Sequence, residues 1–294
     1  MKTLTQAQVL KSLRTLQARK AQTHKGDYGR LLVVAGSPGM SGAAVLCARA
    51  ALRSGVGLVK VACPESIAPI VAGAVPEALG CSLPETPAGA LAARSWKSLE
   101  ESLGWANTLV VGPGCSVQSS AQNLMRRILK QWHGPMVLDA DGLSAAVGHL
   151  DLLRRCPVRA ILTPHPGEMA RLLGKSNEAV QKNRQAAIQE LVRESGSVVL
   201  LKGHQSLVCD PETAPFMNST GNPGMASGGT GDVLSGIAGA FVAQGLLGVQ
   251  GAAAAAYVHG LAGDIAARAL GQISVIASDL VDFLPMAFKS LRRN

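Results

Sequence analysis

NPGMASGGTGDVLSG, residues 222–236, joins a glycine-rich turn directly to the start of a helix. Gly228, Gly229 and Gly231 carry no Cβ atom, so the backbone here can adopt positive φ angles and approach a ligand closely. Asp232 follows them and is expected in the first helical turn. The stretch therefore predicts an anion site with a carboxylate beside it, placed where α/β proteins gather their ligands.

The helix is predicted to run from Asp232 to about Gln244, because Val233, Ile237 and Phe241 recur every four residues and form an apolar stripe. Its free N–H groups and the positive end of its dipole favour a phosphate in the glycine turn. The carboxylate of Asp232 then addresses a hydroxyl group rather than the phosphate itself.

In an alternative interpretation, Thr230 or Asp232 merely caps the helix. The dense packing of glycines, a threonine and an aspartate favours a functional role instead. Because Asp232 lies at a helix N-terminus, we expect it to stay ionised and to be a weak base whose value lies in its placement.

Short apolar strand-like runs alternate with helix-like segments along most of the chain. The expected strands lie in residues 31–36, 58–63, 108–114, 136–142, 160–165 and 197–203. The expected helices cover residues 42–53, 119–131, 167–173 and 178–194, and residues 251–294 are mostly helical. This alternation predicts an α/β fold with a mostly parallel sheet and helices on both faces.

We see no linker or internal repeat, so we expect one domain over residues 1–294. Within it, residues 1–23 form an N-terminal helical extension that carries Leu10, Leu13 and Leu16 on one face. The segment from residue 84 to 89 is expected to be a loop. The order of the strands in the sheet is not predicted.

Five strand ends carry glycine or polar residues, and the carboxyl ends of parallel strands meet at one edge of a sheet. These ends read GSPGMSG (36–42), GPG (112–114), DADG (139–142), TPHPGE (163–168) and KGHQS (202–206). We expect them to share one crevice. The first has the spacing G-x-x-G-x-x-G, which disfavours a dinucleotide fingerprint, and the chain contains no P-loop motif.

Several of these residues have two interpretations. GPG alone is typical of a tight turn. The two carboxylates of DADG either make Asx turns or hold Mg²⁺ through water. His165, stiffened by flanking prolines, is either a substrate contact or an ordinary loop histidine, and Glu168 can cap the next helix. Lys202 either extends harmlessly to solvent or contacts a phosphate, which its neighbour Gly203 favours.

Composition limits the function classes. Of the 294 residues, 47% are hydrophobic and only 3% aromatic, so a large core is expected and few rings are offered to nucleic-acid bases. The net charge of +9 comes from scattered basic residues, which fits a solvated surface or a small polyanionic ligand, not a nucleic acid.

The six cysteines include no C-x-x-C pair and are expected to be small buried residues in a reducing compartment. We find no signal peptide and no membrane-spanning run, so a cytoplasmic protein is expected.

Together these residues predict phosphoryl transfer or phosphate-assisted chemistry on a small alcohol. Such a reaction needs charge neutralisation and positioning, which a helix N-terminus, Lys202 and a metal ion supply. Asp232 would orient or deprotonate the attacking hydroxyl.

The ordered set of motifs resembles the ADP-dependent NAD(P)H-hydrate dehydratase family over nearly the whole chain. The motifs are HKGDYGRLLVVAGS (24–37), SGAAVLCARAALRSGVGLV (41–59), VGPG (111–114), VLDADGL (137–143), LTPHPGEMARLL (162–173), LKGHQSLV (201–208) and NSTGNPGMASGGTGDVLSG (218–236). The resemblance implies a ribokinase-like fold and a lyase that repairs the S epimer of hydrated NADH and NADPH. ADP phosphorylates the hydrate's hydroxyl, and loss of phosphate restores the double bond and leaves AMP.

The resemblance also implies two groups of site residues. The positions similar to the family's hydrate site are Ala43, Gly114, His165 and Asp232. Those similar to its adenine-nucleotide site are Lys202, Gly203, His204, Gln205, Ser206 and Gly231. Ser206 stands where threonine is common, and it keeps the hydroxyl group. Mg²⁺ is the expected cofactor and ADP the co-substrate, but no metal ligand is assigned.

Many bacterial relatives also carry an N-terminal epimerase domain, which the residues before His24 are too few to form. We therefore expect epimerisation to come from another protein, and the family suggests a homo-oligomer such as a tetramer. Two alternatives remain. One is an ATP-dependent ribokinase-like kinase of a vitamin precursor or of a sugar hydroxymethyl group, against which TPHPGE and NPGMASGGTGD argue. The other is a nucleotide-binding sensor, which an intact Asp232 disfavours.

Overall fold

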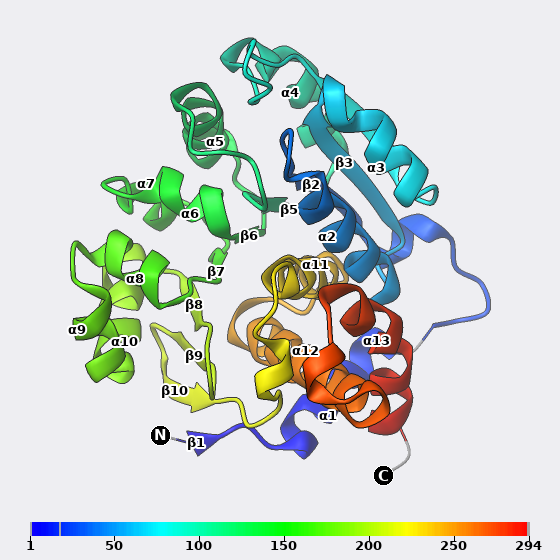
Figure 1. Ribbon diagram of the computed structural model, residues 1–294, viewed down its shortest axis with the longest axis vertical. Helices are drawn as coiled ribbons and strands as arrows, with labels where there is room; N and C mark the ends of the chain where they lie inside the picture. Colours follow the sequence, from blue (N-terminus) through cyan, green and yellow to red (C-terminus); the bar gives the residue numbers. More distant parts are fainter. Residues whose placement is uncertain (1, 18, 293–294) are drawn as a thin grey trace.

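The computed structural model describes residues 2–17 and 19–292, and a single mixed sheet runs through it (Figure 1). Its strands are β1 (Lys2–Thr3), β2 (Arg30–Val34), β3 (Leu58–Pro64), β4 (Leu79–Leu83), β5 (Thr108–Val111), β6 (Met136–Leu138), β7 (Ile161–Leu162), β8 (Val198–Leu201), β9 (Leu207–Asp210) and β10 (Thr213–Met217). They lie in the order β1-β10-β9-β8-β7-β6-β5-β2-β3-β4.

The six strands expected from the sequence are adjacent, as β8-β7-β6-β5-β2-β3, and every pair among them is parallel. β4 extends this block in parallel beside β3. At the other edge β9 is antiparallel to both β8 and β10, and β1 is parallel to β10. The predicted mostly parallel sheet is therefore confirmed, with an antiparallel hairpin that the sequence did not predict.

Helices cover both faces of the sheet. The α-helices are α1 (Gln6–Gln17), α2 (Ser41–Arg53), α3 (Ala68–Ala74), α4 (Trp96–Trp105), α5 (Ser119–Gln131), α6 (Ala140–Ala146), α7 (Asp151–Arg154), α8 (Pro166–Leu173), α9 (Asn177–Lys182), α10 (Arg184–Ser195), α11 (Thr230–Ala243), α12 (Gly248–Leu270) and α13 (Ala277–Leu291). Short 3₁₀ turns are η1 (Lys25–Tyr28), η2 (Glu65–Ile67), η3 (Ala93–Ser95), η4 (Pro223–Met225) and η5 (Gln272–Ser274).

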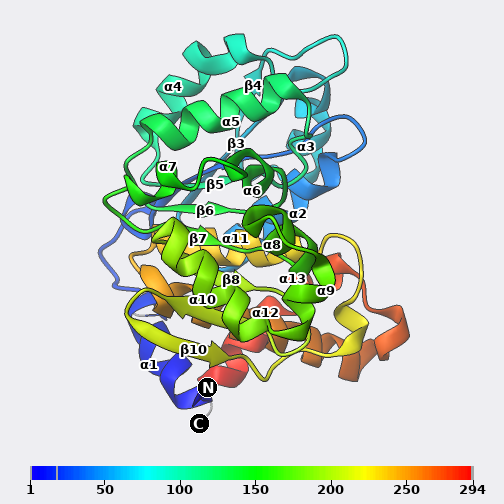
Figure 2. The same cartoon turned by 90° about the vertical axis from the view of Figure 1, so that its left-hand side faces the viewer.

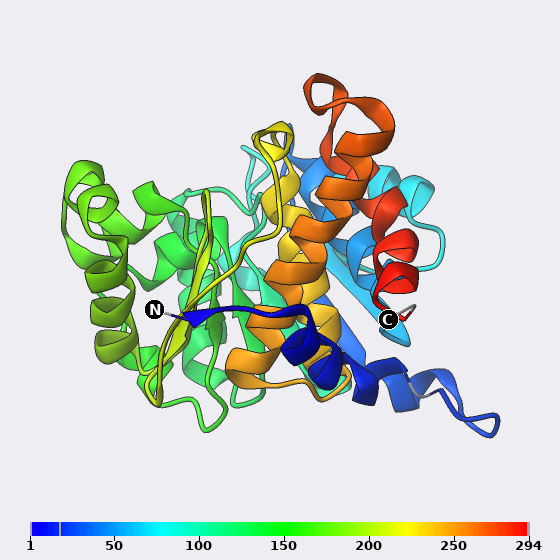
Figure 3. The same cartoon turned by 90° about the horizontal axis from the view of Figure 1, so that it is seen from below.

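Figure 2 shows α4, α5 and α10 in front of the sheet, and Figure 3 shows α11 and α12 packed on its opposite face. The strand side chains alternate between two cores accordingly. Leu31 and Val33 of β2 enter the core shared with α2, α11, α12 and α13, while Leu32 and Val34 enter the core on the other face. All four are fully buried, as expected of a strand covered on both sides.

α11 has the stripe expected from its sequence. Val233, Ile237 and Phe241 are fully buried, and the helix packs closely along α2. The expected helix over 119–131 is α5 residue for residue, and the expected helix at 42–53 is α2 with one more residue at its start. The mostly helical C-terminal part is confirmed by α12 and α13 as far as residue 292.

The prediction of a single helix over residues 178–194 is wrong. The structure has two helices, α9 and α10, separated at Asn183. Asn183 adopts φ −145° and ψ 72°, and its side-chain oxygen accepts a hydrogen bond from the amide of Ala186 at 3.0 Å. Asparagine competes with the helix in this way by capping a new one.

The N-terminal extension is helical as expected, since α1 buries Val9 and Leu13, but it also contributes the edge strand β1. All six cysteines are free thiols, and Cys81 and Cys156 are only partly buried. Within residues 2–17 and 19–292, no helix combines the length and the apolar character that crossing a lipid bilayer requires.

Candidate active site

The carboxyl ends of the central strands converge on the N-terminus of α11. An ideal Cβ built on Gly231 would lie 3.4 Å from Nζ of Lys202, which follows β8, and 3.9 Å from Oδ2 of Asp139, which follows β6. The loops 139–142, 163–168 and 202–206 therefore meet at Lys202, beside the N-terminus of α11. DADG is not a simple turn, because α6 starts at Ala140.

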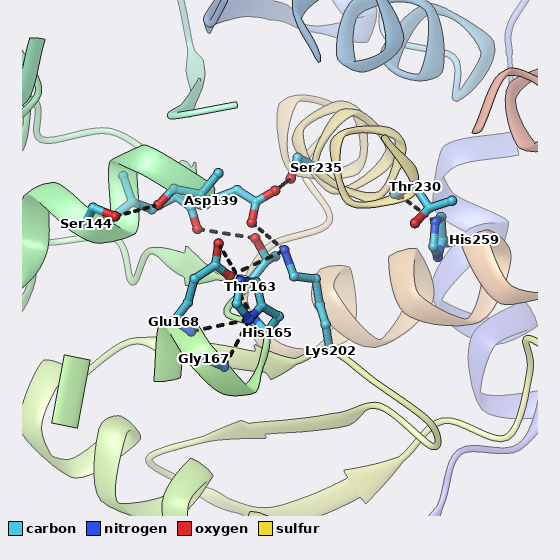
Figure 4. A network of polar contacts seen from close by, with 12 residues as sticks. Asp139, Ser144, Thr163, His165, Gly167, Glu168, Lys202, Thr230, Ser235 and His259 are labelled. Atoms are coloured by element: carbon cyan, nitrogen blue, oxygen red, sulfur yellow. Dashed lines mark hydrogen bonds and ion pairs between the residues drawn. The ribbon is translucent and has the colours of Figure 1, made fainter. Parts of the chain in front are cut away.

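Lys202 is the centre of a charged network (Figure 4). Its Nζ lies 2.7 Å from Oδ1 of Asp139 and 3.7 Å from Oε2 of Glu168. The other oxygen of Asp139 accepts a hydrogen bond from the hydroxyl of Ser235, on α11, at 2.7 Å. Burial alone would lower the pKa of Lys202, but Asp139, Glu168 and Asp232 outweigh it and leave that pKa raised, so the lysine stays charged.

Asp139 and Glu168 are nearly inaccessible, with side-chain exposures of 2% and 7%. Charges buried this deeply require partners, and Lys202 supplies the cation for both. Lys202 therefore neutralises both of these buried carboxylates. Sequence reasoning gave no role to Ser235 and left Asp139 undecided.

The half-buried side chain of Asp232 accepts no hydrogen bond from the described part of the chain. Burial raises its pKa to about 7, and the negative charge of Asp139 adds to this effect while Lys202 opposes it. The expectation that Asp232 simply stays ionised as a weak base is wrong. Desolvation outweighs the helix dipole, and a group with a pKa near 7 is well matched to proton transfer at neutral pH.

The capping alternative is also wrong. The N-cap of α11 is Gly229, with φ 90°, and no side chain within the described residues caps this end of the helix. The hydroxyl of Thr230 donates backwards to the carbonyl groups of Met225 and Ser227. Since neither Thr230 nor Asp232 occupies the first amides of α11, those amides stay available to an anion.

His165 and Glu168 form a capping box at the start of α8. Nδ1 of His165 accepts from the amide of Gly167 at 3.0 Å, and Oε2 of Glu168 accepts from the amide of His165 at 2.7 Å. This assigns the proton of the neutral imidazole to Nε2. Nε2 of His165 lies 3.5 Å from Oε1 of Glu168, and about half of the side chain is exposed.

Ala43 and Gly114 lie against one another. A Cβ on Gly114, whose φ is +63°, would meet the Cβ atoms of Ala43 and Met40 at 3.0 Å. The two loops are joined because the hydroxyl of Ser37 donates to the carbonyl of Gly114 at 2.8 Å. Asp141 supports the same region by accepting from the amide of Ser116 at 2.8 Å. The second carboxylate of DADG thus holds a loop, apart from Lys202.

A cavity of about 450 Å³ opens on the other side of Gly231. It is lined by all six residues expected at the nucleotide site, namely Lys202, Gly203, His204, Gln205, Ser206 and Gly231. Residues of β8, 218–226, α11 and α12 also line it, including Asn222, whose side-chain amide donates to Asp264 at 2.9 Å.

Sequence reasoning missed His259, which α12 places in the wall of this cavity. Burial lowers its pKa to about 4, partly offset by a hydrogen bond with the carbonyl of Thr230 at 2.9 Å, so the ring is neutral at pH 7. Its position within an alanine-rich apolar helix provides no local signal of a site.

No cluster of three or more His, Cys, Asp or Glu side chains suited to a metal occurs among residues 2–17 and 19–292. Mg²⁺ is usually held by one or two carboxylates together with substrate phosphates. The free carboxylate of Asp232 beside the cavity fits a metal that arrives with phosphates, but not a site made by protein groups alone.

The sequence model of a family described as NAD(P)H-hydrate dehydratase matches residues 31–286. An ADP-dependent (S)-NAD(P)H-hydrate dehydratase of Neisseria meningitidis serogroup B is 40% identical over 261 residues, which are 87% of this chain and 83% of that protein. A bifunctional NAD(P)H-hydrate repair enzyme of Moorella thermoacetica is 44% identical over 276 residues, 94% of this chain and 52% of that enzyme. The chain spans about half the length of such bifunctional relatives.

Solved structures show the same architecture. A ribokinase-like superfamily protein of Enterococcus faecalis aligns with a TM-score of 0.85 at 25% identity, over 100% of this chain and 97% of that one. An ADP/ATP-dependent NAD(P)H-hydrate dehydratase of Bacillus subtilis, co-crystallised with ATP and Mg²⁺, aligns with a TM-score of 0.82 at 29% identity over 99% of both chains. The fold is therefore ribokinase-like, as the sequence motifs implied.

Proposed function

Because the chain belongs to the NAD(P)H-hydrate dehydratase family, we propose that it is a hydro-lyase of nucleotide repair. It uses ADP to return the S epimer of hydrated NADH and NADPH to the intact dinucleotides, and it releases AMP and phosphate. The observation that carries this proposal is the adjacency of Gly231, which lines the cavity beside Lys202, and Asp232, whose carboxylate accepts no hydrogen bond from residues 2–17 and 19–292.

ADP occupies the cavity of about 450 Å³, with its phosphates toward Lys202 and the N-terminus of α11. The size of the cavity suits a nucleotide-sized ligand. The loop residues Gly203 to Ser206 offer backbone groups along one wall, and Gly231 lets the backbone approach without a side chain.

The hydrate occupies the crevice on the other side of Asp232, between the Ala43–Gly114 contact and His165. The close packing of Ala43 on Gly114 leaves backbone groups to meet the ligand, and the half-exposed ring of His165 offers a further contact. Asp232 faces the hydroxyl of the hydrate in this arrangement, as the residue that borders both ligands.

Two steps follow from this placement. Asp232 accepts the proton of the hydrate's hydroxyl group. The oxygen of that hydroxyl forms a bond to the terminal phosphorus of ADP, and the bond between this phosphorus and the oxygen of AMP breaks. Phosphate then leaves with the electron pair of the C–O bond while the neighbouring carbon gives up a proton to water, and the electrons of that C–H bond form the double bond. Phosphorylation is needed because hydroxide is a poor leaving group.

A divalent cation fits the charge balance of the site. Asp139, Glu168 and Asp232 outnumber the single cation of Lys202, and the phosphates of ADP add further negative charge. Mg²⁺ bound with the phosphates of the nucleotide would neutralise part of that charge. We also propose a cytoplasmic homo-oligomer, such as a tetramer, that works with a separate epimerase activity.

The proposal is tested by incubating the purified protein with hydrated NADH and either ADP or ATP, and by following nicotinamide absorbance together with AMP, ADP and phosphate. Recovery of absorbance with AMP and phosphate formed from ADP in equal amounts is expected. A stable phosphorylated alcohol instead would favour the kinase alternative. No recovery with either nucleotide would overturn the dehydratase proposal.

A further inference from the structure

Arg184, the first residue of α10, lies beneath the KGHQS loop and binds its backbone. Nη1 donates to the carbonyl oxygens of His204 and Gln205, and Nη2 donates to those of Leu201 and Lys202 at 3.3 Å each. The four Nη protons thus meet four carbonyl groups of one short segment. Such multiple contacts in a fixed plane are what the guanidinium group provides.

The conformation of the loop depends on this arrangement. Gly203 has φ +132° and Gln205 has φ +53°, a left-handed conformation that is uncommon outside glycine. Carbonyl groups on both sides of these residues turn towards Arg184. The amides of Gly203, His204 and Gln205 donate to no other group within residues 2–17 and 19–292.

These same residues line the cavity of about 450 Å³. Successive amides in a turn with left-handed residues form a concave site for an anion. The loop therefore has two sides, with carbonyl groups held by Arg184 on one and unpaired amides available to the cavity on the other.

We propose that Arg184 is a positioning residue for the nucleotide, holding the loop so that its amides face a phosphate group of ADP. The inference rests on the proposed function, because it assigns ADP to this cavity. Arg184 acts without touching the ligand. Its Nη groups are engaged by the loop, its Nε is buried with no hydrogen-bond partner in the described part of the chain, and it does not line the cavity.

The break between α9 and α10 explains how Arg184 reaches the loop. Asn183 ends one helix and caps the next, so Arg184 leaves from the first position of α10, close to the end of β8. A continuous helix through residue 183 would not present this N-terminus. The helix break therefore supports the same function as the arginine.

A matched control lies at the opposite end of α10. Arg154 also binds backbone carbonyl groups, with Nε donating to Glu194 at 2.6 Å and Nη2 donating to Arg193. It does not line the cavity. Arg154 belongs to α7, and Arg154→Ala removes the contacts that its side chain makes with carbonyl groups near the C-terminus of α10. The KGHQS loop is not affected by this substitution.

The test compares the wild-type protein with Arg184→Ala, Arg184→Lys and Arg154→Ala. Equilibrium titration with ADP gives Kd, thermal melting reports stability, and kinetics give KM for each substrate. We expect Arg184→Ala to weaken ADP binding about 10- to 100-fold. KM for ADP should rise accordingly, while KM for the hydrate should stay unchanged. Arg184→Lys should recover only part of the affinity, and guanidinium ion at a non-denaturing concentration should restore binding to Arg184→Ala alone.

Arg154→Ala should retain the ADP affinity of the wild type even where its melting temperature falls. Equal ADP affinities for Arg184→Ala and Arg154→Ala would overturn the inference. Where Arg184→Ala does not fold, Arg184→Lys decides, and wild-type affinity in that variant would overturn it as well. A wild-type protein that binds no ADP would instead contradict the proposed function, and the inference would fall with it.

Discussion

Replacing Asp232 by asparagine is predicted to stabilise the folded protein above neutral pH while it removes turnover. The two side chains have nearly the same shape, and the carboxylate of Asp232 accepts no hydrogen bond from the described residues that the amide would lose. The variant therefore removes one buried negative charge and little else. A buried catalytic charge of this kind lowers the stability of the folded protein, and the protein retains it because function requires it.

The magnitude follows from the pKa of Asp232, which burial and the charge of Asp139 raise from 3.8 to about 7. A shift of about three units corresponds to about 4 kcal/mol against the charged form in the folded state. Because the folded-state pKa is raised, the folded protein binds more protons than the unfolded chain between pH 4 and pH 7. Stability of the wild type therefore falls across that window relative to Asp232→Asn.

Urea unfolding of both proteins at several pH values between 4 and 8 measures this difference, because all other titrating groups are common to the two. We expect Asp232→Asn to be more stable than the wild type at pH 8 by up to about 4 kcal/mol, and the difference to vanish near pH 4. Turnover should fall about hundredfold or more while ADP still binds. A pH-independent difference, or a less stable variant at pH 8, would refute the assignment of a raised pKa to Asp232.

Two further predictions concern the neighbours of Asp232. The rising limb of kcat/KM against pH should lie near pH 7 in the wild type. In Lys202→Met the limb should move to higher pH by about one unit or more, because Lys202 lowers the pKa of Asp232. A limb that stays in place or moves to lower pH would contradict this. Gly231→Ala should keep or raise the melting temperature, since alanine favours a helix, yet weaken ADP binding measured by titration, because the new methyl group would lie 3.4 Å from Nζ of Lys202. Gly104→Ala in α4 is its control, since no atom of the described residues outside its own helix lies within 4 Å of the added Cβ, and an equal loss of affinity in both variants would remove Gly231 from the site.

The central strands could be predicted because they are buried on both faces, so each appears in the sequence as a short continuous apolar run, such as 31–36 and 197–203. The edge strand β4 and the strand β10, which lies beside the edge strand β1, could not be predicted. β4 is mostly exposed and contains a glycine, and β10 contains a proline, so neither has the pattern of a strand by itself. They form because a neighbouring strand offers unpaired backbone groups.

The candidate site divides in the same way. Residues at strand ends, including Asp139, His165 and Lys202, stand out because a polar residue follows an apolar run. His259 and Ser235 lie within apolar helices and become recognisable only when the fold brings them to the crevice. The raised pKa of Asp232 is likewise a property of the assembled site, since its causes include charges on loops distant in the sequence.

The order of events around Asp232 can be tested most directly with hydrated NADH that carries a heavy oxygen isotope in its hydroxyl group. Turnover with ADP should place the isotope in the released inorganic phosphate, one atom per molecule of AMP, because the hydroxyl oxygen leaves as part of a phosphate ester. Recovery of the isotope in water, with unlabelled phosphate, would contradict phosphorylation at that hydroxyl and with it the site described here.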